Sequence, residues 1–429
     1  MTAFLVRLRD PAAREPARFG AKAASQAVLA ASGLPTAGGF CLDAAAYRMQ
    51  VEALGLSGAA RLVLSAAGAD ARRHALTMRL GLMEGPIPPE MEKPLLAARS
   101  EITAAPGREG VVRSSALCED RLGASFAGQF DSYLGLRSEA DFLTAVRACW
   151  ASLWSNRALR YMASHDLDPA ESAMAVIIQP LVRARFSGGG LSRTAEGGMI
   201  LSASPGLGSA IAQGEVVPDH IEIAPDGKMI RNETGRAHHE PGCARGHRGR
   251  RAAHARDAAL SPCLDREEAE ELGRLLRRVE TVMGEPVEIE WAMDDEGFKL
   301  VQARPLVVAS RAQVADELWL QHPRLLGQPS GVGWGEGRAC VVTCECELGR
   351  LAPGEILVTQ VAGPALAPVL PLAAGVVAEL GGSTSHLAAL ARERGIPMVL
   401  GVLNATRRIP EGSTVAVDGV AGVVRWMPS

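Results

Sequence analysis

The chain has 429 residues and a mass of 45.0 kDa, which is more than one ordinary domain holds, so two or three domains are expected. Its 45 basic and 48 acidic side chains give a formal net charge of −3, which argues against nucleic acid or an anionic membrane as the partner. The N-terminus carries no secretory signal, and the most apolar window, 361–380, contains three prolines, so we expect a cytoplasmic protein with reduced cysteines and no membrane span.

The first 309 residues alternate helical and extended patterns. The segments whose apolar spacing predicts helices are 20–33, 44–54, 142–155, 157–164 and 264–283. An apolar, β-branched run at 173–182 predicts a buried strand, and two strands at 287–292 and 299–303 predict a hairpin. This part of the chain is therefore expected to form a mixed α+β domain over 1–309.

A second domain is expected after a connector. Residues 235–262 carry arginines and four histidines without apolar periodicity, which predicts a mobile surface loop. Residues 310–326 form a linker of polar-to-mixed composition, and from residue 327 short strands separated by glycines are interrupted by one helix at about 385–394. We expect a compact, β-rich α/β domain over 327–429, and hence an α+β two-domain fold.

Two segments of the first domain combine a cation with small residues. Lys22 follows a glycine and enters a helix, where an ammonium can meet a polyphosphate; the alternative is a solvated lysine at a helix start. Arg113 follows an apolar strand and precedes a loop rich in Gly, Ala and Ser, whose backbone N–H groups can approach phosphate oxygens. An edge-strand arginine followed by a plain turn is the alternative there.

The predicted hairpin concentrates polar groups on one side. Glu288 and Glu290 are two residues apart and so share a strand face, as do Gln302 and Arg304 on the partner strand. Two carboxylates, an amide and a guanidinium on one face are hard to bury without a ligand, whereas Mg²⁺ with a polyphosphate would satisfy all of them. A solvent-facing hairpin with salt bridges is the alternative.

The string GGSTSHLAALARERGIPMVLGV, residues 381–402, is the most specific in the chain. A strand ends, two glycines turn the chain, and Thr384 and Ser385 precede His386 at the first turn of a helix. Unpaired N–H groups at that helix end suit an oxyanion, and a neutral imidazole is a competent nucleophile near pH 7. A capped helix beside an ordinary surface histidine is the alternative.

The cysteines and the remaining histidines do not predict a metal site. Cys344 and Cys346 would share a strand face near Cys340, but the spacing lacks the CxxC geometry and nothing completes four ligands. The histidines of the predicted surface loop are interpreted as loop residues; they are His238, His239, His247 and His254.

Residues 327–429 resemble the phosphohistidine swivelling domain of the phosphoenolpyruvate (PEP)-utilising enzymes, on the segments GQPSGVGWGEGRA, PGEILVTQ, GGSTSHLAALARERGIPMVLGV and GSTVAVDGVAGVVRW. Residues 1–309 resemble the ATP-binding domain of the same superfamily, which includes the PEP synthase, pyruvate phosphate dikinase and rifampin phosphotransferase families. The resemblance implies an ATP-grasp-like domain followed by a swivelling domain. The match is imperfect at 203–220, where Ser209 stands in place of the usual glutamate.

The resemblance also implies roles for particular residues. His386 matches the phosphorylated histidine, and Glu290 and Gln302 match residues that hold Mg²⁺ and nucleotide. The residues implied to contact ATP, at its phosphates or beside its adenine, are Lys22, Arg113, Gly128, Ser132, Gln179, Pro180, Leu181, Val182, Gln302 and Arg304.

These matches imply a dikinase-type phosphotransferase. ATP and Mg²⁺ would phosphorylate His386 with release of AMP and phosphate, and the phosphohistidine would then donate to a small-molecule acceptor. Full-length members of the superfamily add a barrel or an acceptor-binding domain. The acceptor site is therefore expected on a separate partner protein, at the interface of the two domains, or nowhere. A phosphocarrier charged by another protein and a nucleotide sensor without turnover are the alternatives.

Overall fold

A computed structural model describes residues 4–66, 68–119, 126, 128–236, 261–308 and 317–427. The chain divides into two compact units. The first comprises Met1–Val182 with Lys299–Arg304, and the second comprises Arg183–Phe298 with Pro305–Ser429. None of the described helices is both long and apolar enough to cross a membrane.

The first unit is built on a five-stranded antiparallel sheet in the order β1-β2-β5-β3-β4. Its strands are β1 (Leu5–Arg7), β2 (Phe40–Leu42), β3 (Gly110–Ala116), β4 (Ser132–Leu136) and β5 (Met174–Pro180). Its helices are η1 (Pro11–Arg14), α1 (Pro16–Ala31), α2 (Ala44–Ala53), α3 (Ser57–Ser65), α4 (Gly68–Glu84), α5 (Pro89–Ile102), α6 (Glu139–Ser152) and α7 (Asn156–Ala163).

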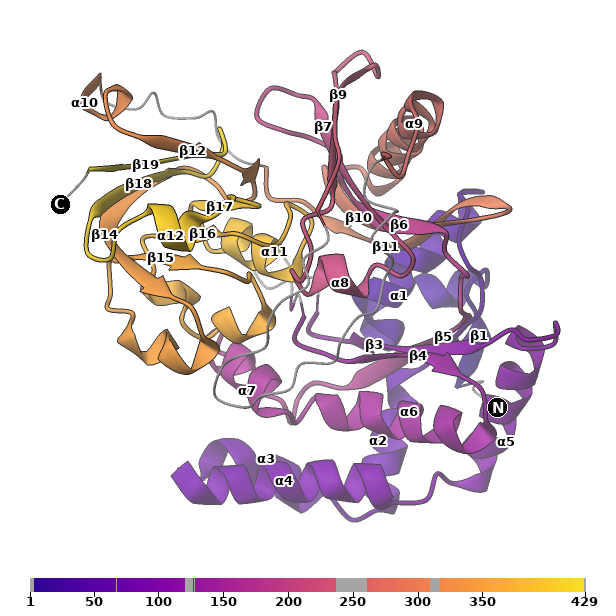
Figure 1. The fold of residues 1–429 in the computed structure, drawn as a ribbon. Coiled ribbons are helices and arrows are strands. Elements are labelled where there is room, and N and C mark those ends of the chain that lie inside the picture. Colours follow the sequence, from indigo (N-terminus) through magenta and orange to yellow (C-terminus); the bar gives the residue numbers. More distant parts are fainter. Residues whose placement is uncertain are drawn as a thin grey trace. The chain divides into compact units, whose positions relative to one another are not determined.

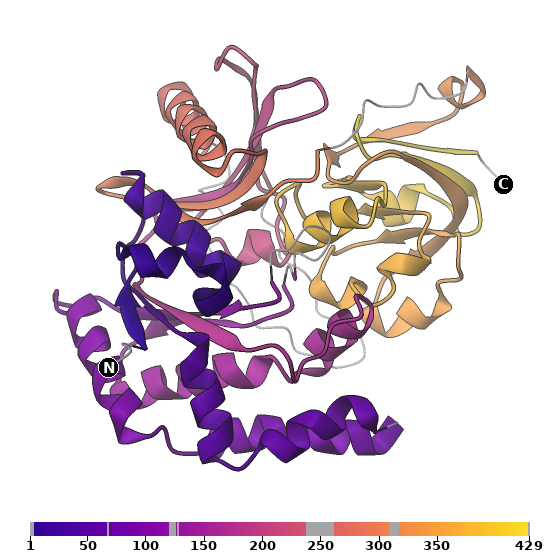
Figure 2. The ribbon, with the colours of Figure 1, turned by 180° about the vertical axis from the view of Figure 1, so that it is seen from behind.

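Helices cover both faces of this sheet. The helix α1 packs against β3 and β5 on one face and α6 packs against the same strands on the other (Figures 1 and 2). The central strand β5 is buried from Met174 to Gln179, because its β-branched and apolar side chains point into both helical layers. The predicted strand at 173–182 is therefore confirmed, as are the predicted helices that correspond to α1, α2, α6 and α7.

The second unit begins with a six-stranded sheet in the order β11-β10-β6-β7-β8-β9, of which residues 299–304 of β11 belong to the first unit. Its strands are β6 (Phe186–Leu191), β7 (Met199–Pro205), β8 (Asp219–Ile223), β9 (Met229–Glu233), β10 (Val287–Asp294) and β11 (Gly297–Pro305), and its helices are α8 (Ser209–Ala212) and α9 (Arg266–Met283). The predicted hairpin and the predicted helix at 264–283 are thus confirmed. A capping box between Asp265 and Glu268 fixes the start of α9.

The helix α9 determines which face of this sheet is apolar. Leu276 of α9 lies beside Ile289 and Leu201, which are fully buried on the two strands that flank β6. Since side chains alternate along a strand, Ser202 and His220 belong to the opposite face. That second face carries the polar side chains of the sheet.

The rest of the second unit is an eight-stranded sheet in the order β12-β19-β18-β14-β15-β16-β17-β13. Its strands are β12 (Arg324–Leu326), β13 (Gln328–Pro329), β14 (Trp334–Val342), β15 (Ile356–Thr359), β16 (Gly375–Ala378), β17 (Met398–Leu400), β18 (Thr414–Asp418) and β19 (Val423–Met427). Its helices are α10 (Glu317–Leu320), η2 (Glu345–Arg350), η3 (Pro364–Leu366), η4 (Leu370–Leu372), α11 (His386–Glu393) and α12 (Ala405–Arg408). The predicted short strands and the predicted helix near 385–394 are confirmed.

Three sequence expectations differ from the structure or lie outside it. The predicted linker 310–326 contains α10 and β12, and β12 pairs with β19. The prediction that Cys344 and Cys346 share a strand face is wrong, because β14 ends at Val342 and both residues belong to the start of η2. Most of the predicted surface loop, 237–260 with its four histidines, lies outside the described residues.

Candidate functional site

Lys22 is a buried cation with an anionic partner. Its side chain is 8% exposed, and Nζ lies 2.7 Å from Oε1 of Glu119, whose side chain is 4% exposed. Lys22 Nζ also donates to the backbone carbonyl of Ser114 in β3, at 3.2 Å. The ion pair and the hydrogen bond together hold this ammonium between the helix α1 and the strand β3.

A kink in α1 directs Lys22 toward β3. Gly20 has φ +76° and ψ 159° inside the helix, a backbone conformation that L side chains rarely adopt. A Cβ on Gly20 would lie 2.5 Å from the carbonyl oxygen of Ser115. The Ser115 hydroxyl joins both sides of the kink, donating to the carbonyl of Phe19 at 2.7 Å and accepting from the N–H of Ala23 at 3.1 Å. The position of Lys22 is therefore set by Gly20 and Ser115 together.

Arg113 lies on β3, beside the same stretch, and is 8% exposed. Its Nη2 donates to Oε1 of Gln302 at 2.9 Å, and Nη1 donates to the carbonyl of Val301 at 2.6 Å. Ser132 of β4 is its cross-strand neighbour, and Gly128, with φ +68°, turns the chain before that strand. The structure thus brings together Arg113, Gln302 and Ser132, three residues that the sequence predicted for the nucleotide site.

The segment expected beside adenine is the end of β5 and the residues after it. Gln179 is 3% exposed, and its Nε2 donates to the carbonyl of Gly38 at 2.9 Å. Pro180 pairs with Gly110 of β3, and the N–H of Leu181 donates to the carbonyl of Glu109 at 2.8 Å. The N–H of Leu181 therefore already has an acceptor within the first unit. Val182 is the last residue of the segment Met1–Val182.

The polar side chains of the hairpin have more protein partners than the sequence analysis assumed. Gln302 accepts from Arg113, and Glu288, 7% exposed at its side chain, forms an ion pair of 2.7 Å with Arg392 of α11. The argument that the carboxylates and the amide require a ligand for their burial is therefore wrong for Glu288 and Gln302. Glu290 is half-buried on β10, opposite Gly189 of β6, and Arg304 is 7% exposed on β11.

His386 is the first residue of α11, and its side chain is half-buried. The Ser385 hydroxyl caps the helix by accepting from the N–H of Ala388 at 3.3 Å. Arg392, on the same helix, donates from Nη1 to the carbonyl of Ser383 at 2.6 Å. One guanidinium therefore fixes the loop before His386 and also binds Glu288 of β10.

Two buried hydroxyls in this loop have no hydrogen-bond partner among the residues that the structure describes. They belong to Ser383, which is fully buried, and to Thr384, which is 9% exposed. Thr384 lies directly over Gly189 of β6, where a Cβ would come within 2.4 Å of the threonine Cβ. Buried polar groups in native proteins are nearly always satisfied, so these two hydroxyls, beside a helix N-terminus, have hydrogen-bonding capacity that the described residues do not use.

Sequence reasoning missed two charged residues of this arrangement. Glu119 stands six residues after Arg113, in a loop that was considered only for its small residues. Arg392 lies within the recognised string, six residues after His386, but its partner Glu288 is 104 residues away in the sequence. Local spacing gives no signal for a pairing over that separation.

The residues present fit a nucleotide with Mg²⁺. Among the described residues, no group of three or more His, Cys, Asp or Glu side chains could hold a metal ion by itself. Mg²⁺ is usually held by one or two carboxylates, substrate phosphates and water rather than by a protein cage. A carboxylate such as Glu290 and an amide such as Gln302 are ligands of that kind, and the buried cations Lys22, Arg113 and Arg304 suit polyphosphate oxygens.

Comparison with protein families gives two matches that together cover most of the chain. Residues 16–323 match the family model described as pyruvate phosphate dikinase, AMP/ATP-binding domain. Residues 351–422 match the model described as PEP-utilising enzyme, mobile domain.

Curated relatives give the same result. The chain is 31% identical over 456 residues to phosphoenolpyruvate synthase of Aeropyrum pernix, with 94% of this chain and 56% of the relative covered. It is 30% identical over 462 residues to phosphoenolpyruvate synthase of Pyrococcus furiosus, with the same coverage, and 31% identical over 367 residues to that of Escherichia coli, with 80% of this chain and 46% of the relative covered. The chain thus spans about half the length of these relatives.

Proposed function

We propose, from the premise that this chain belongs to the superfamily of PEP-utilising enzymes, that it is an ATP-dependent phosphotransferase that carries a phosphoryl group on His386. The observation that carries the proposal is the loop before His386. The unpartnered hydroxyls of Ser383 and Thr384 and the N-terminus of α11 give a phosphorylated imidazole hydrogen-bond donors as soon as it forms.

The first unit would hold the nucleotide. Lys22 and Arg113 would contact its phosphates, and Arg304 would do so from β11. Gly128 and Ser132 would line the phosphate site. The end of β5 and the two residues after it would meet the adenine; these residues are Gln179, Pro180, Leu181 and Val182. Mg²⁺ bound through Glu290 and Gln302 would supply charge neutralisation of the phosphates.

The chemistry that we propose is that of a dikinase. The neutral imidazole of His386 attacks the β-phosphorus of ATP, AMP leaves, and the terminal phosphate of the resulting pyrophosphoryl group is lost to a second acceptor. Phosphoryl transfer depends mainly on positioning and on charge neutralisation, which Lys22, Arg113 and Arg304 are suited to provide. The remaining phosphoryl group on His386 then passes to a small-molecule acceptor, on this chain or on a separate protein.

The test measures the phosphorylation of His386 by ATP in the absence of an acceptor, which we call charging. Purified chain is incubated with Mg²⁺ and ATP labelled at the β-phosphate, and we expect acid-labile, base-stable label on the protein together with AMP. In His386→Ala both signals should disappear, and in Lys22→Met the rate should fall at least 100-fold. His74→Gln, on α4 of the first unit, is a matched control that should charge normally.

Other products would contradict the proposal. Release of ADP instead of AMP would indicate an ordinary kinase. Nucleotide binding with neither label nor AMP would indicate a sensor. Label that arrives only from a second phosphorylated protein would indicate a phosphocarrier.

A further inference from the structure

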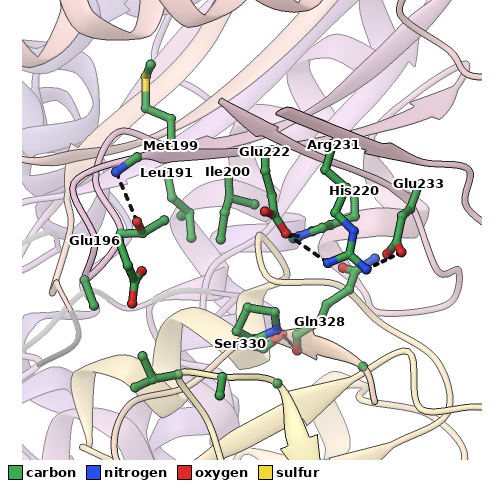
Figure 3. A pocket seen from close by; sticks show the side chains of 18 of the residues that line it. Leu191, Glu196, Met199, Ile200, His220, Glu222, Arg231, Glu233, Gln328 and Ser330 are labelled. Carbon is green, nitrogen blue, oxygen red and sulfur yellow. Dashed lines mark hydrogen bonds and ion pairs between the residues drawn. The ribbon is translucent and has the colours of Figure 1, made fainter. Parts of the chain in front are cut away.

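A cavity of about 860 Å³ in the second unit is lined by residues of β7, β8 and β9 and by residues 326–331. Charged side chains on its wall pair with one another: Figure 3 shows Arg231 between Glu222 and Glu233, at 3.3 and 2.5 Å. A charged ligand would have to displace one of these partners and leave the other charge unpaired. Two thiols at the start of η2, in contrast, contact each other close to the solvent.

Cys344 and Cys346 form this thiol pair. Cys344 is the N-cap residue of η2 and is half-buried, whereas Cys346, in the first turn, is exposed. Their Sγ atoms lie 2.6 Å apart, and the Cys344 Sγ also accepts from the N–H of Cys346 at 3.4 Å. Because both side chains already point to the same place, a disulfide can form between them without movement of the neighbouring strands.

Cys340, the third cysteine of this stretch, does not compete with the pair. It lies on β14 and is 3% exposed. Burial, and after it the nearby carboxylate of Glu355, raises the pKa of the Cys340 thiol, so this thiol stays protonated near pH 7. Since the thiolate is the nucleophile in disulfide exchange, the two thiols of η2 are better placed to react.

The carboxylates around the pair are held by other donors. Glu347 accepts from the N–H of Thr343 at 3.1 Å. Glu411 pairs with Arg350 at 2.5 Å. Among the described residues, no group of three or more His, Cys, Asp or Glu side chains could hold a metal ion, so the pair lacks the further ligands of a zinc site. Two thiols in contact are then suited to an S–S bond.

Such a bond would be easily reversed. It would close a loop around the single residue Glu345, and a cross-link over so short a loop restricts the unfolded chain very little. The exposed Cys346 is also open to attack by a reductant. Exposed disulfides of this kind are the labile, regulatory ones, in contrast to buried structural disulfides.

We propose that Cys344 and Cys346 are a site of reversible oxidation, at which a low-molecular-weight disulfide converts the two thiols into an intrachain disulfide. The thiolate of the exposed Cys346 attacks one sulfur of the reagent, and the first reagent thiol leaves. The thiolate of Cys344 then attacks Sγ of Cys346 in the mixed disulfide, and the second reagent thiol leaves. The cysteines lose two electrons and two protons, which reduce the reagent to two thiols.

The test is incubation of the folded, full chain with bis(2-hydroxyethyl) disulfide, an uncharged reagent that the surrounding carboxylates do not repel. Remaining thiols are alkylated in denaturant, and peptides are analysed by mass spectrometry without reduction. Cleavage after Arg338 and Arg350 releases Cys340 and the pair in one peptide. We expect this peptide to lose two hydrogen atoms and to carry an alkyl group on Cys340 alone. Dithiothreitol, added before the denaturant, should restore alkylation of all three cysteines.

Variants identify the two sulfurs. Cys344→Ser should stop at the mixed disulfide on Cys346, because the second thiolate is missing. Cys346→Ser should form no intrachain bond. Cys340→Ala is the matched control, and its peptide should lose two hydrogen atoms as the native peptide does.

The remaining outcomes would overturn the proposal. These are a native peptide that keeps all three thiols, a disulfide that joins either sulfur to Cys340 or to a cysteine elsewhere, and loss of two hydrogen atoms in Cys344→Ser. A bond that dithiothreitol reduces only in denaturant would show that the oxidation is not reversible in the folded chain. None of these measurements involves ATP, so their result is independent of the charging test.

Discussion

Lys22 and Glu119 form a buried ion pair in the first unit. Both side chains are at most 8% exposed, and each is the other's closest opposite charge among the contacts described above. A buried ion pair contributes little net stability when both partners are present, but removal of one partner leaves a charge that water cannot reach. Glu119 therefore holds the Lys22 ammonium in place beside β3.

The consequence for stability can be measured in Glu119→Gln. We expect the first unit to lose about 3 kcal/mol of unfolding free energy, because the Lys22 ammonium loses its buried partner. The measurement is the urea midpoint, followed by circular dichroism with and without ATP. Glu101→Gln, whose carboxylate pairs with Arg7 at the exposed surface, is the control and should leave the midpoint almost unchanged. An equally small change in Glu119→Gln would show that the pair is not needed.

The motif around His386 predicted some features of single residues and not others. The string around His386 predicted the helix, its cap and the position of the histidine, since those features are local. The buried pair of Arg392 with Glu288 was not predicted, although both residues lie in segments that the sequence analysis had singled out. Which carboxylate faces which guanidinium depends on how the two sheets of the second unit pack.

Among the elements, α1 determines the geometry of the proposed nucleotide site. The helix begins at Pro16, four residues before the predicted start, and its first turn is separated from Lys22 by the kink at Gly20. Sequence spacing predicted a helix here and a lysine near its start. It could not predict the kink, because the contact that requires it comes from Ser115, on a strand 95 residues further along.

Gly20→Ala tests the role of this kink. Alanine at φ +76° is strained by about 1 to 2 kcal/mol, and the clash of its Cβ with Ser115 adds to that. We expect the free energy of unfolding, measured from the urea midpoint, to fall by about 3 kcal/mol in total. We also expect a slower charging rate, since Lys22 would shift. Gly33→Ala is the matched control: it has φ +71° but no atom within 4 Å of the new Cβ. Equal losses in both variants would show that backbone strain alone accounts for the effect.

The helices at 57–102 were not predicted from the sequence. No helix or strand was predicted there, and the structure has the three helices α3, α4 and α5. Leucines such as Leu62, Leu76 and Leu80 are about half exposed on these helices. Outward-facing leucines blur the spacing that distinguishes a buried face from a solvated one, so periodicity gave no clear signal.

At the scale of the whole molecule, the segment that carries His386 belongs to the same compact unit as residues 183–298. The segment after residue 327 packs within the second unit against the sheet that contains β6, β7, β8 and β10. Gly381 donates its N–H to the carbonyl of Val216 at 3.1 Å, and Thr384 lies over Gly189. For His386 to serve two sites, these contacts and the ion pair of Glu288 with Arg392 would have to open and close in each cycle.

Glu288→Gln is expected to loosen this packing. The neutral amide leaves Arg392 buried without its anion, which should reduce the stability of the packed arrangement by about 3 kcal/mol. The measurement is hydrogen exchange, in which amides of residues 381–390 should lose protection while those of the β14–β18 core keep theirs. Glu285→Gln, an exposed carboxylate three residues earlier, should leave the exchange pattern unchanged. Unchanged exchange in Glu288→Gln would show that the ion pair does not hold the loop.

The sequence by itself determined the local features of this protein: the strands, the helices with clear apolar faces, the motif that ends in His386, and the membership of its superfamily. These depend on residues close together in the chain, where spacing and cap chemistry act directly. Only the tertiary structure decided which buried charges are paired, which polar atoms are left without partners, and where a cavity remains. Those properties depend on contacts between residues far apart in the chain, such as Glu288 and Arg392, which are 104 residues apart. The free energy of a buried polar group depends on such contacts, and no local pattern records them.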